Sequence, residues 1–205
     1  MGLYDKYILP KCLHWACNMK PIRKQREKVV PLAEGQVLEI GIGSGLNLPH
    51  YKTENVTKLW GLEPADEMRV MANKRAEELG IEVEFLGLPG EEIPLEDNSV
   101  DTVLMTYTLC TIPETERALR GMSRVLRSGG RLIFCEHGAA PDAGVRRWQD
   151  RINPLWKRIA GGCNVNRAIP ELIEVGGFRI DNFETMYIPG WRPLTFNYWG
   201  TAVSA

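Results

Sequence analysis

Three glycines that follow a mostly apolar run form the segment of this sequence best suited to bind a ligand. Gly41, Gly43 and Gly45 alternate with other residues directly after Gln36–Ile40, a run of the kind that forms a buried strand. Glycine lacks a Cβ atom, so a ligand can approach the backbone N–H groups of such a loop closely. A helix expected from about Leu46 would add its N-terminus, which also attracts anionic groups. The segment therefore predicts a nucleotide-like ligand.

The spacing of these glycines discriminates between nucleotide cofactors. Dinucleotide-binding loops follow the pattern G-x-G-x-x-G, in which the third glycine comes three residues after the second. Here Leu46 occupies that position, and Gly45 comes two residues after Gly43. The loop therefore argues against an NAD-dependent oxidoreductase, an alternative that would return only if the expected ligand failed to bind.

An acidic residue lies twenty residues after Gly43. Glu63 ends the second expected strand, a position from which a carboxylate accepts hydrogen bonds from ribose hydroxyls. The alternative is a charge at a helix N-terminus, because Asp66 and Glu67 follow. Met68, one helical turn further on, is a candidate to pack against a base, and a core methionine is the alternative.

Polar residues in the second half of the chain are candidates for the chemistry itself. His137 ends the fifth expected strand and is the best candidate for a general base; the alternative is a histidine that holds a loop. Glu136 is not expected to orient it, because adjacent strand residues point to opposite faces. Asn164 and Arg167 would hold a loop over the site, meet an anionic substrate group, or form a structural network. Cys163 is either a reactive thiol or, as we favour, a small buried apolar residue.

These residues need an alternation of strands and helices to bring them together. Alternating elements imply a parallel sheet with helices on both faces, and such sheets bind ligands beyond the carboxyl ends of their strands. The expected strands are Gln36–Ile40, Thr57–Leu62, Glu82–Leu86, Val100–Met105 and Arg131–Cys135, followed by an antiparallel pair at Phe178–Tyr187 and Thr195–Val203. The expected helices are Asp66–Leu79, Glu114–Leu126, Val145–Ile159 and Ala168–Val175, with one or two amphipathic helices in residues 1–30.

Several motifs in sequence order resemble those of the class I S-adenosylmethionine (SAM) methyltransferases. They are E-x-G-x-G-x-G at Glu39–Gly45, the acid Glu63, L-P-G-E-E-I-P at Leu88–Pro94 and R-V-L-R-S-G-G at Arg124–Gly130. The resemblance implies a three-layer, Rossmann-like α/β fold with a seven-stranded, mostly parallel sheet and one antiparallel strand. It also implies SAM as the cofactor and S-adenosyl-L-homocysteine as its product.

The same resemblance assigns roles to individual residues. Glu39 would bind the ammonium group of SAM, directly or through water, or else brace the loop. Pro89 stands where the family has an adenine-reading Asp, so adenine recognition would rely on the backbone of Gly90 and Glu91 or on another side chain. Thr106 and Leu109 would lie beside the transferred methyl group. The cofactor candidates are Glu39, Gly41, Gly43, Gly45, Asn47, Glu63, Pro64, Met68, Gly90, Glu91, Thr106 and Leu109.

A second group of motifs concerns the methyl acceptor. E-H at Glu136–His137, followed by W-Q, N-P-x-W and G-C-N-x-x-R within residues 148–167, resembles the alkyl-thiol S-methyltransferases of eukaryotes and related bacterial small-molecule methyltransferases. The resemblance implies a small lipophilic acceptor, with thiol sulfur as the first choice and His137, Asn164 and Arg167 as catalytic candidates. Quinone-pathway C-methyltransferases and phospholipid N-methyltransferases have similar cores and are alternatives, and a non-catalytic SAM-binding protein is a third.

Composition bounds the class of protein. With 205 residues, 44% of them hydrophobic, and a net charge of −1, the chain fits one globular domain without a nucleic-acid partner. Its three histidines and five cysteines lack metal-ligand spacing, so no metal site is expected, and reduced cysteines favour the cytoplasm. Neither a membrane-spanning run nor a signal peptide is predicted. The sequence does not predict an oligomeric state.

Four regions are expected within the single domain, residues 1–205. Residues 1–30 form a helical lid, residues 36–136 the SAM-binding core, residues 143–175 the substrate-side helices and residues 178–203 the terminal antiparallel strands. The basic N-terminal helices could instead touch anionic lipid, as basic amphipathic helices do. We favour the lid over peripheral membrane contact.

Overall fold

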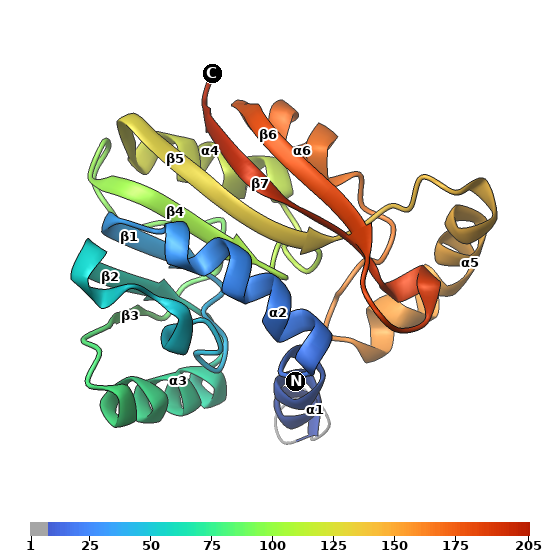
Figure 1. The fold of residues 1–205 in the computed structure, drawn as a ribbon, viewed down its shortest axis with the longest axis horizontal. Helices are drawn as coiled ribbons and strands as arrows, with labels where there is room; N and C mark the ends of the chain where they lie inside the picture. Colours follow the sequence, from blue (N-terminus) through green and yellow to red (C-terminus); the bar gives the residue numbers. More distant parts are fainter. Residues whose placement is uncertain (1–7) are drawn as a thin grey trace.

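The computed structural model describes residues 8–205, and a seven-stranded sheet forms its centre (Figure 1). The first seven residues of the expected lid lie outside the described residues. The strands are β1 (Gly35–Ile40), β2 (Val56–Leu62), β3 (Glu84–Leu86), β4 (Val100–Thr106), β5 (Leu126–His137), β6 (Phe178–Tyr187) and β7 (Phe196–Ser204). Their order across the sheet is β3-β2-β1-β4-β5-β7-β6.

Strand direction matches the expected mixed sheet. The pairs from β3 to β5 are parallel, whereas β7 runs antiparallel to both β5 and β6. The chain runs from β1 outward to β3 and then returns to β4 on the other side of β1. The strand order therefore reverses between β1 and β4, and an open α/β sheet binds its ligand at such a reversal.

Helices cover both faces of this sheet, as the alternation of elements predicts. On one face α4 (Thr115–Val125) and α6 (Ile169–Val175) pack against the larger apolar core, which includes the fully buried Met122 and Phe134. On the other face lie α2 (Lys20–Val29) and α3 (Asp66–Leu79), which contribute Val29 and Ala76 to a second core. The protein is thus a three-layer α/β structure.

The N-terminal segment forms two short helices, of which the first lies near the carboxyl ends of the central strands and the second runs back across one face of the sheet (Figure 1). The first, α1, spans Leu9–Cys17 and is followed by α2. Pro10 and Pro21 each lie in the first turn of a helix, where proline fits because the N–H groups there have no helical partner. The prolines therefore start the helices, and the break between them lies at residues 18–19.

The expected helix from about Leu46 is wrong. The chain between β1 and β2 holds only two 3-10 turns, Leu48–His50 and Thr53–Asn55. Gly45 has a φ of 73°, and Pro49 lacks an N–H group, so neither residue favours a helix here. The glycine loop consequently has no α-helix N-terminus behind it and relies on its own backbone N–H groups.

Other element boundaries differ more modestly from the expected ones. Strand β5 begins at Leu126 rather than Arg131, with an irregular register opposite residues 100–102 of β4. Strand β3 is shorter than expected, whereas α3 and β6 have the expected bounds. Helix α3 ends at Gly80, whose left-handed conformation with a φ of 66° explains the stop. The remaining helix, α5, spans Ala143–Ile159 and contains Pro154.

Candidate active site

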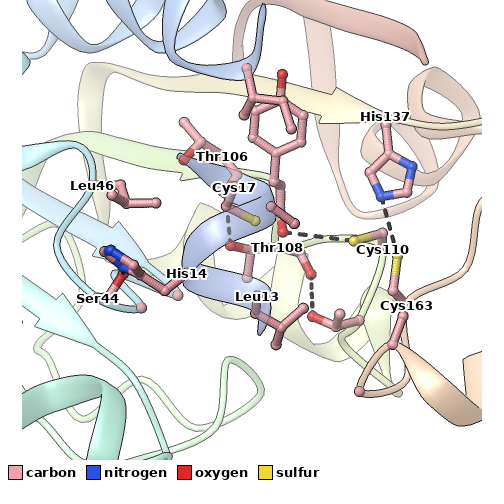
Figure 2. A pocket seen from close by; sticks show the side chains of 18 of the residues that line it. Leu13, His14, Cys17, Ser44, Leu46, Thr106, Thr108, Cys110, His137 and Cys163 are labelled. Carbon is pink, nitrogen blue, oxygen red and sulfur yellow. Dashed lines mark hydrogen bonds between the residues drawn. The ribbon is translucent and has the colours of Figure 1, made fainter. Parts of the chain in front are cut away.

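A cavity of about 730 Å³ lies at the carboxyl ends of the central strands and is lined by residues of α1 and α2 (Figure 2). The glycine loop after β1 and Glu63 after β2 line one part of it. His137 at the end of β5, together with Cys110 and Cys163, lines another. The cavity therefore has a nucleotide-type cradle and a cluster of sulfur and imidazole groups within a single enclosure.

The backbone of the glycine loop explains why glycine stands at alternating positions. Gly41, Gly43 and Gly45 have φ values of 67°, 56° and 73°, which side chains rarely allow. A Cβ at Gly41 would lie 2.4 Å from Thr108, and one at Gly45 would lie 2.8 Å from Leu48. A Cβ at Gly43 would meet nothing closer than 3.5 Å, because this residue faces the cavity. The loop thus leaves space for a ligand at Gly43.

A buried polar network supports the loop from below. Glu39 accepts hydrogen bonds from Asn47 Nδ2 at 2.8 Å and from the Tyr51 hydroxyl at 2.6 Å. The amide of Asn47 also donates to Thr106 Oγ1 at 2.9 Å. Burial raises the pKa of Glu39 to about 7, against the opposing effect of these hydrogen bonds. Glu39 therefore braces the loop, and it also lines the cavity.

Two buried polar atoms beside this network have no hydrogen-bond partner among residues 8–205. They are Asn47 Oδ1, an acceptor, and Arg26 Nε, a donor. Both residues line the cavity, and Arg26 lies close enough to Glu39 to lower its pKa. Buried polar groups are nearly always paired in folded proteins. One free donor and one free acceptor are suited to a ligand with a carboxylate and an ammonium group.

Sequence reasoning missed Arg26. It lies in the basic N-terminal segment, yet Arg26 is only 5% exposed and stacks over the ring of Tyr107 at 5.0 Å. A basic residue in a run of basic residues gives no sign that it points inward. Tyr51, whose hydroxyl donates to Glu39, was also missed, because that contact depends on the path of the loop after β1.

Glu63 lies at the end of β2, as the sequence predicts. Its carboxylate accepts the N–H groups of Gly43 at 3.2 Å and Ala65 at 2.9 Å, which ties the loop to the start of α3. Burial raises the pKa of Glu63 above its usual value. Further predicted cofactor residues also line this part of the cavity: Pro64, Met68, Gly90, Glu91 and Thr106.

Three residues distant in sequence form the sulfur and imidazole cluster, which we define as Cys110, His137 and Cys163. The Nε2 atom of His137 lies 3.2 Å from Cys163 Sγ (Figure 2). The indole N–H of Trp156 donates to the same sulfur at 3.4 Å. The three ligand-type atoms of the cluster all lie within 4.8 Å of one another. The sequence spacing predicts no such grouping.

The cluster changes the expected role of Cys163. Hydrogen bonding from the Cys110 thiol, together with the charge of His137, holds the pKa of the Cys163 thiol well below its usual range. Burial alone would lower the pKa of His137, but the neighbouring Cys163 sulfur raises it. Cys163 is buried, as expected, but it is a polar partner of His137 rather than an inert apolar residue.

The buried Glu136 and Asn164 and the half-buried Arg167 hold the loop that carries Cys110, residues 108–112. Glu136 accepts the N–H groups of Thr108 at 2.7 Å and of Leu109 at 3.1 Å. Asn164 donates from its side chain and from its backbone to the Cys110 carbonyl, both at 2.9 Å. The guanidinium of Arg167 donates to the carbonyls of Leu109 and Ile112. The loop is therefore fixed from three directions.

The structure places four predicted site residues away from the cavity lining: Gly45, Leu109, Asn164 and Arg167. Asn164 and Arg167 contact backbone carbonyls, which corresponds to the loop-holding alternative in their sequence interpretation. Glu136 likewise serves the loop and does not hydrogen-bond to His137, as the strand geometry predicts.

Helix α1 closes over the glycine loop. His14 Nδ1 lies 2.7 Å from Ser44 Oγ, and Leu13 and Cys17 of the same helix face the cavity (Figure 2). Burial lowers the pKa of His14, which favours its neutral form beside the serine hydroxyl. Among the helices of residues 8–205, none combines the length and hydropathy needed to cross a membrane.

Comparison with known proteins gives consistent matches. Residues 38–134 match a family model described as a methyltransferase domain. Human thiol S-methyltransferase TMT1B is 32% identical over 198 residues, which cover 91% of this chain and 80% of that protein. Phosphatidylethanolamine N-methyltransferase of Cereibacter sphaeroides is 35% identical over 107 residues, which cover 51% of this chain and 52% of that protein.

A solved structure shows the same fold. The crystal structure of a SAM-dependent methyltransferase from Thermotoga maritima, described as a possible histamine N-methyltransferase, matches with a TM-score of 0.69. The match covers 98% of both chains at 22% sequence identity. At that identity the likeness concerns the fold.

Proposed function

The chain belongs to the class I SAM-dependent methyltransferases, and from that premise we propose that it methylates the sulfur of a small lipophilic thiol. Enzyme class and cofactor follow from the family. The acceptor is the proposed part, and so is the role of α1 and α2 as a lid over it. One observation carries the choice of acceptor: the cluster of Cys110, His137 and Cys163 shares a cavity with the glycine loop.

The cavity residues fit SAM. The free acceptor Asn47 Oδ1, with Glu39 behind it, suits the ammonium group, and the free donor Arg26 Nε suits the carboxylate. The glycine loop leaves open space at Gly43, and Glu63 lies beside it for the ribose hydroxyls. Pro89 and Gly90 line the cavity beyond Glu63, where the adenine would lie.

The remaining part of the cavity favours an apolar acceptor. Side chains of Leu9, Leu13, Ile112, Trp156 and Ile188 line it, and the cluster supplies the polar groups at that side. A free alkyl thiol is ionised to only a few per cent near neutral pH, so a site that favours the thiolate accelerates its attack. His137, whose pKa the neighbouring Cys163 sulfur raises, provides such a site when it is protonated, because an adjacent imidazolium lowers the pKa of a thiol.

When bound, SAM would supply an electrophilic methyl group: the acceptor sulfur would form the new S–C bond, and the sulfonium C–S bond would break with its electron pair left on S-adenosyl-L-homocysteine. The protein positions the acceptor for this displacement and excludes water from the cavity. Helices α1 and α2 exclude the water, because the contact between His14 and Ser44 ties this lid to the glycine loop.

The test uses purified protein, methyl-labelled SAM and a simple alkyl thiol. We expect labelled thioether well above the rate without enzyme, with Glu63→Ala reducing both product and SAM binding. Asp66→Asn is the matched control, because Asp66 is an exposed acid close to Glu63. SAM binding without thioether would exclude thiols and direct the search to amines and quinones.

A phospholipid amine is the second candidate acceptor. The relative from Cereibacter sphaeroides matches half of this chain, and large apolar side chains near the N-terminus and on α5 are exposed, among them Trp15 at 72% and Leu155 at 66%. Phosphatidylethanolamine vesicles in the same assay test it. The cluster of thiols and imidazole favours the sulfur acceptor, because an amine lone pair needs no thiolate-stabilising site.

A further inference from the structure

We propose that Cys110, His137 and Cys163 bind a borderline-soft divalent cation of the Zn²⁺ class and leave one coordination position open to the cavity. This proposal deepens the proposed function and rests on it, since the open position would receive the sulfur of the acceptor thiol. The cation site itself depends only on the three side chains and is tested separately below.

The geometry of the cluster suits such a cation. Zinc binds sulfur at about 2.3 Å and imidazole nitrogen at about 2.0–2.1 Å, so ligand atoms around a tetrahedral ion lie roughly 3.5–3.8 Å apart. The His137 Nε2 and Cys163 Sγ atoms are 3.2 Å apart, and all three ligand atoms lie within 4.8 Å of one another. Side-chain shifts of a few tenths of an ångström would place the three atoms around one ion.

The donor set selects the class of cation. Two thiol sulfurs and one imidazole nitrogen are soft and borderline ligands, which disfavour Mg²⁺ and Ca²⁺ and favour Zn²⁺. Sites with four protein ligands are structural, whereas three protein ligands and an open position are typical of catalytic zinc. Cys17 of α1 also lines the cavity but is not among the three clustered ligands. The cluster therefore corresponds to the open type.

The surroundings hold the three ligands in place. Asn164 and Arg167 bind the carbonyls of the loop that carries Cys110, and Glu136 binds its N–H groups. The indole N–H of Trp156 donates to Cys163 Sγ at 3.4 Å. Metal ligands are commonly oriented by such outer hydrogen bonds. Three side chains, two of them buried and one half-buried, hold this one short loop, which is explained if the position of Cys110 is critical.

The chemical step balances without a further reactant. The acceptor thiol binds the cation through sulfur and releases its proton to bulk water, so that the sulfur carries a thiolate lone pair. That lone pair forms the bond to the methyl group, and the sulfonium bond breaks as described above. The resulting thioether is a weaker ligand than a thiolate and leaves, which restores the open position.

The experiment measures metal binding by the full chain, purified without a histidine tag and depleted of metal. One equivalent of Zn²⁺ or Co²⁺ is added, unbound ion is removed, and bound metal is counted by mass spectrometry. We expect one ion per chain and, with Co²⁺, the charge-transfer absorption of sulfur ligands. Cys110→Ser and Cys163→Ser should each weaken binding at least tenfold, and His137→Gln should do the same.

Cys12→Ser is the matched control, because Cys12 is exposed on α1 and outside the cavity lining. Each variant is first checked for a native circular dichroism spectrum and for SAM binding. Wild-type protein that retains no ion, or cluster variants that bind Co²⁺ as tightly as Cys12→Ser, would overturn the proposal. Loss of metal binding in any one folded variant of the cluster, with metal binding unchanged in Cys12→Ser, supports the proposal.

A second arm separates this proposal from the proposed function. Addition of 2-mercaptoethanol to the Co²⁺ protein should change its visible spectrum, and the change should be absent in Cys163→Ser. If thioether forms equally fast with and without metal, the cation does not activate the acceptor and that part of the proposal fails, while thiol methylation stands. If the ion binds and the thiol alters its spectrum, but no thioether forms, the cation site stands and the proposed function fails.

Discussion

The Nε2 atom of His137 lies 3.2 Å from the Sγ atom of Cys163, although 26 residues separate them in sequence. His137 ends β5, and Cys163 follows α5, so the contact joins the sheet to the helical region beyond it. Cys110, which follows β4, completes the group. This contact adds a paired sulfur and imidazole group to a part of the cavity that is otherwise lined mainly by apolar side chains.

Replacement of His137 tests whether that contact serves the chemistry. We expect His137→Gln to lower the rate of thiol methylation at least tenfold, because an orienting group and ligand of the cluster is lost. The dissociation constant for SAM should change less than about threefold, since the cofactor cradle lies elsewhere in the cavity. Isothermal titration with SAM and a labelled-thioether assay measure the two quantities. Equal loss of both would identify His137 as a structural residue.

Substitution by alanine should reduce the stability of the protein by different amounts at two glycines of the same loop. Gly45→Ala places a Cβ 2.8 Å from Leu48 and 3.1 Å from the Ala72 backbone at a φ of 73°, so we expect a loss of about 2–4 kcal/mol in stability. Gly43→Ala adds strain but meets no atom closer than 3.5 Å, so its stability loss should be about 1–2 kcal/mol. Thermal unfolding compares the two variants.

The same pair separates stability from cofactor binding. The methyl group of Gly43→Ala points into the cavity, so SAM affinity should fall at least tenfold in this variant, although it should be more stable than Gly45→Ala. If Gly43→Ala bound SAM as tightly as the wild type, the cofactor would not lie against this loop.

The raised pKa of Glu39 leads us to expect that SAM binding depends on pH. Its pKa is raised to about 7, chiefly by burial, so the carboxyl is largely protonated below that pH in the free protein. The ammonium group of SAM favours the carboxylate, so binding releases a proton. Affinity should therefore rise up to tenfold per pH unit below about pH 7 and level off above it.

Glu39→Gln keeps the shape of the side chain and removes its titration. Titration calorimetry at several pH values should show a flatter profile for this variant. The stability of the free protein should show the opposite sign: the raised pKa means that stability is highest where Glu39 is protonated and falls as pH rises through about 7. An unchanged affinity profile in Glu39→Gln would assign the pH dependence to another group.

The fold could be predicted well because its signals are local. Runs of apolar residues, or a helix stop such as Gly80, mark the strands and helices from residue 56 onward in the sequence. The expected helix after Leu46 is absent because Pro49 and the side chains of Asn47 and Tyr51, which point toward Glu39, set a different local structure.

That most of the proposed cofactor residues line one cavity could also be predicted, because these residues follow the strands that position them. The acceptor side was not, because its geometry depends on where three distant segments meet. No spacing rule connects Cys110, His137 and Cys163, and nothing in a basic segment reveals that Arg26 turns inward. Such contacts are set by tertiary packing and require the structure.

Arg167 provides a test of the support around the cluster. Its guanidinium donates to the carbonyls of Leu109 and Ile112, both of which are buried residues. Arg167→Leu leaves two buried acceptors without this donor, at a cost of about 1–3 kcal/mol each. We expect a clear fall in Tm, and slower thiol methylation because the loop that carries Cys110 loses its position. Arg167→Lys should restore part of both, since one donor remains.

The control for Arg167→Leu is Arg158→Leu, which removes an exposed arginine from α5 and should leave Tm and activity close to the wild type. SAM affinity should change little in either variant, because neither side chain lines the cavity. The alternative role for Arg167, contact with an anionic substrate group, makes a different prediction. It requires an unchanged Tm and a raised KM only for thiols that carry a carboxylate, and that result would contradict the loop-holding role.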